Sequence, residues 1–266
     1  MPFTNVRDIQ LYYEVQGSGP KLLYINGTGA DLRRQPNVFA SPLADHFTLL
    51  SYDQRGLGQS DKPATPYTMA DYAEDANALL DATGWERCLV MGVSFGGMVA
   101  QEFAVRYPQR VERLVLACTS SGGAGGASYP LHELLHLSVR AKAKHMLAIG
   151  DTRQDAAWQA ANPQQVAELL DLAETMAAVG ADEPGRELGA RLQILARQDH
   201  DTYDRLPTLK MPVLIAGGRY DGIAAVANQE ALQAQIPHAQ LELFTGGHGF
   251  LQQDLAAYTR IAAFLK

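Results

Sequence analysis

The sequence lacks the features that mark membrane-spanning, disulfide-rich and nucleic-acid-binding proteins. Its 266 residues contain no run of about 18 apolar residues, so no membrane span is expected. Only two cysteines are present, Cys88 and Cys118, and both lie in apolar runs, so we expect buried thiols and no disulfide framework. The formal net charge of -7 argues against a nucleic-acid partner, because phosphate binding requires basic patches.

The N-terminus also lacks an apolar core of signal-peptide length, and we therefore expect a cytoplasmic protein. Apolar residues make up 47% of the chain, as is ordinary for a globular protein with a full core. The length suits one large α/β domain with an insertion. The sequence makes no prediction of an oligomeric state.

Short apolar segments that alternate with helical segments predict the α/β class. The segment 8–16 alternates apolar and polar residues, which is typical of an antiparallel edge strand. Continuous apolar strands are expected at 22–25, 47–52, 88–93, 111–117, 212–216 and 241–244. Helices are expected at about 68–83, 96–107 and 250–265. Apolar strands separated by helices indicate a parallel sheet with helices on both faces.

The middle of the chain differs from both ends. Residues 120–206 are rich in Ala, Leu and Gln, with helical spacing and no convincing strand. We therefore expect a core domain built from 1–119 and 207–266, interrupted by a helical insertion over 120–206.

The strongest chemical signal is Gly92-Val93-Ser94-Phe95-Gly96, which lies between an apolar strand and a helix. A serine on such a turn adopts a strained backbone and needs small neighbours, and the turn lifts its hydroxyl above the sheet edge. The dipole of the following helix favours negative charge at this point. The pattern predicts that Ser94 is a nucleophile; the alternative is a tight turn whose serine only caps the helix.

A serine nucleophile needs a base and an acid that orients it. His248 lies in Thr245-Gly246-Gly247-His248-Gly249, directly after a strand, where flanking glycines permit close backbone contact. Asp221 follows the strand 212–216, and a carboxylate past the carboxyl end of a parallel strand lies at the same sheet edge as Ser94. We therefore predict Ser94, Asp221 and His248 as the catalytic residues, in the chain order serine, acid, histidine.

The negative oxygen formed during serine attack requires two N–H donors. We expect one from the backbone of Phe95, next to Ser94, and the other from Thr28, in the loop after the strand 22–25. Gly27 and Gly29 would let that loop approach closely. The alternative is that this loop is an ordinary glycine turn.

With these residues assigned, the whole chain resembles the α/β-hydrolase superfamily. It is most similar to small bacterial esterases and lactonases, such as 3-oxoadipate enol-lactonases and acyl-homoserine lactonases of this fold. The resemblance implies a mostly parallel eight-stranded sheet, with the segment after Cys118 forming a helical cap over the active site. The chain departs from many relatives in having Asn26-Gly27 where they carry His-Gly. Serine at 94 argues against dehalogenases and epoxide hydrolases, which use a carboxylate nucleophile.

The expected activity is that of a serine esterase or lactonase, a carboxylic ester hydrolase that acts on a small-molecule ester or lactone. Candidate substrates are acyl-homoserine lactones and enol-lactones. The mechanism requires no metal and no organic cofactor, and no nucleic-acid or membrane partner is expected. Two alternatives stay open. The same residues support carbon–carbon bond hydrolysis, thioester hydrolysis or perhydrolysis, and a non-catalytic ligand receptor can keep this fold.

Side chains in two places are candidates for substrate contact. Asn26 and Gly27 lie in the loop before Thr28, and four apolar or aromatic candidates lie in the insertion. Those four are Tyr129, Leu134, Met146 and Trp158. The alternative for the insertion residues is that they pack the cap onto the core.

Overall fold

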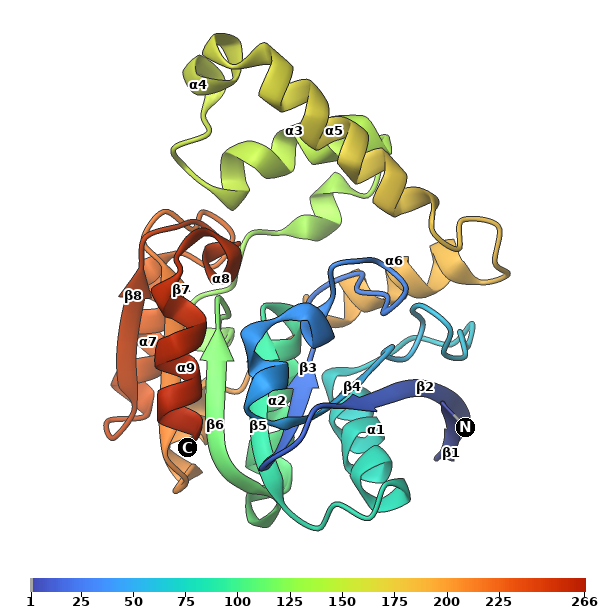
Figure 1. The fold of residues 1–266 in the computed structure, drawn as a ribbon, viewed down its shortest axis with the longest axis vertical. Coiled ribbons are helices and arrows are strands. Elements are labelled where there is room, and N and C mark those ends of the chain that lie inside the picture. Colours follow the sequence, from blue (N-terminus) through green and yellow to red (C-terminus); the bar gives the residue numbers. More distant parts are fainter. Residues whose placement is uncertain (1) are drawn as a thin grey trace.

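A sheet of eight strands runs through the computed structural model, which describes residues 2–266 (Figure 1). The strand order is β1-β2-β4-β3-β5-β6-β7-β8. Strands β1 and β2 pair antiparallel with their neighbours, and β3 to β8 are parallel. The strands are β1 (Phe3–Val6), β2 (Ile9–Gln16), β3 (Lys21–Ile25), β4 (Thr48–Tyr52), β5 (Cys88–Val93), β6 (Val111–Ala117), β7 (Val213–Gly218) and β8 (Gln240–Phe244). The predicted α/β class and mostly parallel eight-stranded sheet are confirmed.

Helices cover both faces of this sheet. Helices α1, α2 and α7 pack on one face, whereas α8 and α9 pack on the other. Their bounds are α1 (Met69–Ala82), α2 (Phe95–Arg106), α7 (Val226–Gln235), α8 (Phe250–Gln253) and α9 (Ala256–Leu265). Helix α1 begins with a capping box, in which Thr68 and Asp71 each accept a hydrogen bond from the other's backbone N–H.

The strand side chains divide between the two cores. Leu23 and Ile25 of β3 lie in the core with α1 and α2, whereas Leu22 and Tyr24 lie in the core with α9. Successive side chains of a strand point to opposite faces, so a strand buried on both faces must be apolar throughout. This explains the continuous apolar runs of the central strands.

The structure differs from the predicted elements at both ends of the chain. Strand β1 and helix α7 have no counterpart among the predictions. The predicted helix 250–265 is wrong as one element, because it breaks after Gln253. The Asp254 carboxylate accepts hydrogen bonds from the N–H groups of Thr245 and Ala256, at 2.8 and 2.9 Å. Such side-chain bonds to the backbone compete with the helical ladder.

The segment between β6 and β7 contains four α-helices. They are α3 (Val139–Gly150), α4 (Ala156–Ala161), α5 (Pro163–Ala178) and α6 (Arg186–Ala196). Figure 1 shows α3, α4 and α5 as a lobe above the edge toward which the parallel strands point, with α6 lying along that edge. None of the helices within residues 2–266 is both long enough and apolar enough to cross a bilayer.

Candidate active site

Ser94 occupies the sharp turn between β5 and α2. Its backbone has φ 55° and ψ -117°, which lies in a region that L-residues rarely adopt. The Ser94 N–H donates to the carbonyl of Ala117 at 2.8 Å, and the Thr119 hydroxyl donates to the Ser94 carbonyl at 2.8 Å. The end of β6 and the residues just after it therefore hold the strained turn through both its N–H and its carbonyl group.

Two glycines around Ser94 are required by close backbone approach. A Cβ added at Gly92 would collide with the Gly96 carbonyl, and one added at Gly96 would collide with the carbonyls of Ile25 and Asn26. The first turn of α2 therefore packs directly on the end of β3. This contact brings the loop after β3 against Ser94, because a Cβ added at Gly27 would lie 3.5 Å from Ser94 Cβ.

His248 lies in the loop after β8 and reaches Ser94. The ring atom Nε2 lies 2.9 Å from Ser94 Oγ, and Nδ1 lies 2.8 Å from Asp221 Oδ2. An ionised carboxylate only accepts hydrogen bonds, so Nδ1 carries the proton and Nε2 is left as the acceptor for the serine hydroxyl. The three side chains, spread over 154 residues of sequence, form one hydrogen-bonded chain.

Asp221 lies in the turn after β7 with its carboxylate fully buried. Its Oδ1 accepts the N–H groups of Ile223 and Ala224, at 2.7 and 2.9 Å, which leaves Oδ2 for His248. These bonds satisfy the buried carboxylate and fix its direction.

The loops that carry Asp221 and His248 touch through their backbones. The Tyr220 N–H donates to the Gly246 carbonyl at 2.9 Å. A Cβ added at Gly218 would collide with the carbonyls of Gly246 and Gly247. Gly218 therefore permits the close approach of the two loops, whereas the absence of a Cβ at Gly247 makes room for the Gly150 carbonyl at the end of α3.

Two backbone N–H groups beside Ser94 have no acceptor within residues 2–266. They are those of Phe95, at the N-terminus of α2, and Thr28, in the loop after β3. The Thr28 hydroxyl is also buried without a hydrogen-bond partner in this part of the chain. An oxyanion site requires N–H donors that are free of other acceptors, so the N–H groups of Phe95 and Thr28 stay the predicted donors.

The loop that carries Thr28 is braced by polar side chains. The Asn26 amide donates to Ser51 Oγ at 2.8 Å, and Gln54 donates to the Asn26 carbonyl at 2.8 Å. The side chain predicted to contact substrate at position 26 is therefore engaged in holding the loop. From α6, Gln193 Oε1 accepts the Gly29 N–H at 2.8 Å.

The buried carboxylate of Asp53 also holds the loop that follows β3. Asp53 accepts the N–H groups of Leu32 and Gln59, each at 2.8 Å. Burial raises the pKa of Asp53 to about 6, although these hydrogen bonds oppose the shift. Asp53 thus holds two loop segments together and does not touch Ser94.

The C-terminal end of α3 contacts the loop that carries His248 and the loop that carries Asp221. The N–H of His248 donates to the Gly150 carbonyl at 2.6 Å, and the N–H of Gly222 donates to the Ile149 carbonyl at 2.9 Å. Asp151 is 3% exposed and accepts a hydrogen bond from Gln253 at 3.2 Å. Gln193 and Asp151 are not predictable from the sequence, because no local pattern pairs either residue with a partner about 100 residues or more away.

The substrate contacts predicted for the segment between β6 and β7 lie in two places. Leu134 is buried against Leu131 and Ile194, and Tyr129 and Met146 pack on the same small apolar cluster. Trp158 lies on α4, at the outer end of the lobe in Figure 1, away from the sheet edge. The four side chains therefore do not form one cluster, and their contact with substrate stays a prediction.

Metal-ligating side chains do not gather in this region. Within residues 2–266, no group of three or more His, Cys, Asp or Glu side chains could hold a metal ion. The two cysteines are free and buried, and burial raises the pKa of Cys88 to about 12, so its thiol stays protonated.

The chain matches known proteins over nearly its whole length. A family model described as the alpha/beta hydrolase fold matches residues 20–254. The putative carbamate hydrolase RutD of Variovorax paradoxus is 31% identical over 94% of this chain and 93% of its own. The 3-oxoadipate enol-lactonase 2 of Acinetobacter baylyi is 25% identical over 91% of this chain and 87% of its own. The crystal structure of an enol-lactonase from Burkholderia xenovorans superposes with a TM-score of 0.79 at 26% identity, covering 99% of both chains.

Proposed function

The chain belongs to the α/β-hydrolase fold family, and on this basis we propose that it hydrolyses a carboxylic ester or lactone through an acyl-enzyme on Ser94. One observation carries the proposal: the strained Ser94 has its hydroxyl 2.9 Å from His248 Nε2, while His248 Nδ1 is bound by Asp221. A serine hydroxyl is a weak nucleophile, and this arrangement is the general means of activating it.

In the first half-reaction, Ser94 Oγ attacks the substrate carbonyl carbon as His248 Nε2 takes the hydroxyl proton. The carbonyl oxygen becomes negative and accepts hydrogen bonds from the N–H groups of Phe95 and Thr28. Asp221 stabilises the imidazolium through Nδ1–H. The carbon–oxygen bond to the leaving alcohol then breaks, and His248 returns its proton to that oxygen.

In the second half-reaction, water attacks the acyl-enzyme. His248 removes one water proton, the tetrahedral intermediate collapses, and Ser94 recovers its proton from the imidazolium. The products are a carboxylic acid and an alcohol. When the substrate is a lactone, the two groups stay in one hydroxy acid, because the leaving alcohol is tethered to the acyl group.

We assign residues 120–206 the role of a cap over this site. The contacts from Gln193 to the Thr28 loop and from Gly150 to His248 support this role, because they join the insertion to both sides of the reaction centre. A cap that excludes water strengthens the electrostatic interactions at the carbonyl.

The similarity to enol-lactonases supports the ester and lactone class, and the similarity to a putative carbamate hydrolase makes carbamates the leading competitor. A substrate panel separates these activities. We expect p-nitrophenyl esters and simple lactones to be hydrolysed faster than p-nitrophenyl carbamates, thioesters and vinylogous diketones. Turnover of only the carbamate or only the diketone would contradict the ester assignment.

The Ser94→Ala variant tests whether this is an enzyme at all. We expect kcat to fall by at least ~10³-fold with an unchanged unfolding midpoint, since the hydroxyl is the nucleophile and its removal leaves the fold intact. Undiminished turnover in this variant would contradict the mechanism, and tight ligand binding without product in the wild type would favour a receptor.

A further inference from the structure

Helix α6 lies along the sheet edge and packs directly on the loop after β4 (Figure 1). A Cβ added at Gly189 would lie 2.2 Å from the Gly56 carbonyl oxygen, and one added at Gly56 would lie 3.1 Å from the Gly189 carbonyl oxygen. Two glycines that face each other permit contact between the two backbones. The distance between α6 and the sheet core is therefore set by this glycine pair.

Ion pairs fasten the residues just before α6 to the loop after β3. Glu183 pairs with Arg33 of that loop, and Lys62 Nζ lies 3.6 Å from Glu183 Oε2. Arg33 also pairs with Asp31 at 2.7 Å, and hydrogen bonds to both carboxylates raise its pKa. These pairs are partly exposed, so each adds little stability, but together they tie the beginning of α6 to the loop that carries Thr28.

Gln193 extends the contact of α6 with this loop by one helical turn. It follows Gly189 by four residues, so the two residues lie on the same face of α6. The Gln193 side chain is fully buried, and its Oε1 accepts the Gly29 N–H at 2.8 Å. The Gly29 carbonyl accepts a hydrogen bond from Arg34 Nη1 at 2.8 Å. Both backbone polar groups of Gly29 are therefore held by side chains, one of which comes from α6.

Gly29 belongs to the turn that presents the Thr28 N–H. Within residues 27–30, the Ala30 N–H donates to the Gly27 carbonyl at 3.4 Å. Gly29 has φ 69°, as the third position of a type II turn requires, whereas a type I turn has a negative φ there. The two turn types differ in the direction of the peptide between Thr28 and Gly29. Gln193 accepts the N–H of this peptide and therefore holds it in one direction.

The Thr28 N–H thus lies between two side-chain anchors of different origin. Gln54, after β4, donates to the carbonyl of Asn26 at 2.8 Å, two residues before Thr28. Gln193 accepts from Gly29, the residue after Thr28. A donor to the developing negative oxygen must be held in place before the reaction, because a misplacement of ~1 Å costs on the order of 10²-fold in rate. One anchor comes from the sheet core and the other from α6.

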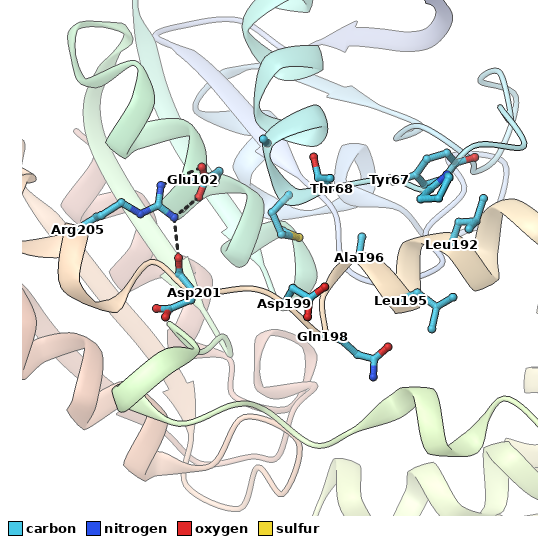
Figure 2. Close-up of a pocket in the computed structure, with 13 residues that line it drawn as sticks. Tyr67, Thr68, Glu102, Leu192, Leu195, Ala196, Gln198, Asp199, Asp201 and Arg205 are labelled. Atoms are coloured by element: carbon cyan, nitrogen blue, oxygen red, sulfur yellow. Dashed lines mark hydrogen bonds and ion pairs between the residues drawn. The ribbon is translucent and has the colours of Figure 1, made fainter.

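The side of α6 that faces residues 66–70 is not filled. Leu192 and Ala196 line a cavity of about 480 Å³ there, together with Tyr67 (Figure 2). Leu192 directly precedes Gln193 in the chain. Helix α6 therefore has space beside it, and its position depends on the glycine contact and the ion pairs at its beginning.

We propose that Gln193 is a positioning residue for the predicted oxyanion donor Thr28, so that the reaction centre is complete only when α6 is packed on the sheet core. The inference rests on the proposed function and adds the element that controls one of its hydrogen-bond donors. Loss of the Gln193 oxygen, or displacement of α6 from Gly56, frees the Gly29 peptide to rotate, and the Thr28 N–H then loses its direction. The loss falls on the transition state, in which the oxygen is negative, and spares binding of the neutral ground state.

Gln193→Met tests the role of the acceptor, because methionine keeps the length of the side chain but not its oxygen. We expect kcat for p-nitrophenyl butyrate to fall by about 10-fold or more, with KM changed less than about 2-fold. Gln165→Met, at an exposed position on α5, is the matched control and should retain the wild-type kcat.

A pair of ketones separates this role from a general loss of structure. An alkyl trifluoromethyl ketone accepts Ser94 Oγ at its carbonyl carbon, the hydroxyl proton passes to His248, and the carbonyl oxygen becomes negative. Gln193→Met should weaken its inhibition by about the factor lost from kcat/KM. The methyl ketone of the same chain length stays an uncharged ligand and should bind equally well to wild type and variant. Equal weakening for both ketones would overturn the positioning role.

A double-mutant cycle tests whether the position of α6 acts through Gln193. Gly189→Ala forces α6 away from Gly56 and should lower kcat by about 10-fold or more. In the Gln193→Met background the same change should cost less than about 3-fold, because the hydrogen bond that it disrupts is already absent. Independent losses that multiply would overturn the proposal. If Gln193→Met does not fold, Gly189→Ala carries the comparison of the two ketones.

Amide hydrogen exchange followed by mass spectrometry separates this inference from the proposed function. In the peptide 26–34, exchange should be faster in Gln193→Met and Gly189→Ala than in wild type and Gln165→Met, because the Gly29 N–H loses its acceptor. If exchange changes in this way and no ester is hydrolysed by the wild type, the proposed function fails while the hold of α6 on the loop stands. Unchanged exchange, or unchanged kcat, in a folded Gln193→Met protein overturns the proposal.

Discussion

The sheet core and the helical segment between β6 and β7, which we call the insertion, are held together in different ways. The central strands β5, β6 and β7 are almost wholly buried between two apolar cores. In the insertion, α3 and α4 have no buried residue, α5 has only Val166 and Leu170, and α6 alone has a buried face. The core therefore fixes the reacting groups, whereas the insertion touches them at a few polar points.

This difference suggests a division of roles. The three reacting side chains follow β5, β7 and β8, so their positions are set by the sheet. The insertion contributes main-chain contacts at Ile149 and Gly150 and the hydrogen bond from the Gly29 N–H to Gln193. We expect substitutions in the core to affect chemistry and folding, and substitutions in the insertion to affect substrate choice and the fine position of the loops.

The largest effect is expected from the acid of the core. Asp221→Asn should lower kcat by about 10⁴-fold with little change in the unfolding midpoint, because an amide can keep the bonds to Ile223 and Ala224 but disfavours the required imidazole tautomer. Steady-state kinetics and thermal unfolding measure the two quantities. Asp204→Asn, an exposed position before β7, is the matched control; an equal loss there would refute a specific role for Asp221.

The second prediction concerns acid stability where the insertion rejoins the core. Burial lowers the pKa of His200 to about 4, below its usual value near 6.5, so the unfolded chain binds a proton there that the folded chain does not. The free energy of unfolding therefore falls as the pH drops from about 6.5 to 4. His200→Asn should reduce the loss between pH 7 and 4.5 by about 2–3 kcal/mol.

Urea unfolding at the two pH values measures that loss, and other titrating groups such as Asp53 cancel in the comparison of variant and wild type. His46→Asn, at an exposed position, should behave as the wild type. An unchanged pH dependence in a folded His200→Asn protein would contradict the burial of a neutral imidazole at this position.

The third prediction compares equivalent changes in the two regions. Gly96→Ala should destabilise the protein by about 2 kcal/mol and lower activity, because its Cβ collides with the Ile25 and Asn26 carbonyls. Gly150→Ala, at the end of α3, meets no atom within 4 Å and should be neutral or slightly stabilising. Equal losses of unfolding free energy in the two variants would show that the two regions do not differ in packing as described.

The smallest effect on activity is expected where the end of α3 contacts the sheet core. Asp151→Ala removes the acceptor of Gln253 and Arg153 beside the His248 loop, and should lower kcat by about 10-fold while KM changes less. Asp155→Ala, which removes the N-cap of α4 in the same insertion, should leave kcat unchanged. If both variants lose activity equally, the insertion acts through its stability alone.

The sequence predicted the core better than the insertion for a physical reason. Strands β5 and β6, the Thr68 cap and the glycines around Ser94 each leave a local pattern, because they reflect burial, capping or close backbone approach. The predicted α/β class is confirmed, and Ser94, Asp221 and His248 come together as the patterns around them suggest. The break at Asp254 depends on a bond to Thr245, which local periodicity does not reveal.

The contacts of the insertion leave no such pattern. Gln193 meets Gly29 and Arg197 meets the Ser128 loop only after folding, and glutamine or arginine at the end of a helix is ordinary on a protein surface. Trp158 lies on α4, at the outer end of the lobe, and its role in substrate contact stays a prediction.

Covalent labelling of Ser94 tests the central claim most directly. A fluorophosphonate should add one adduct to the peptide that contains Ser94, and the rate should fall strongly in His248→Asn, because the base that activates the hydroxyl is lost. Ser94→Ala should not be labelled. Absence of the adduct in the wild type, or labelling at the same rate without His248, would contradict the proposed nucleophile and its activation.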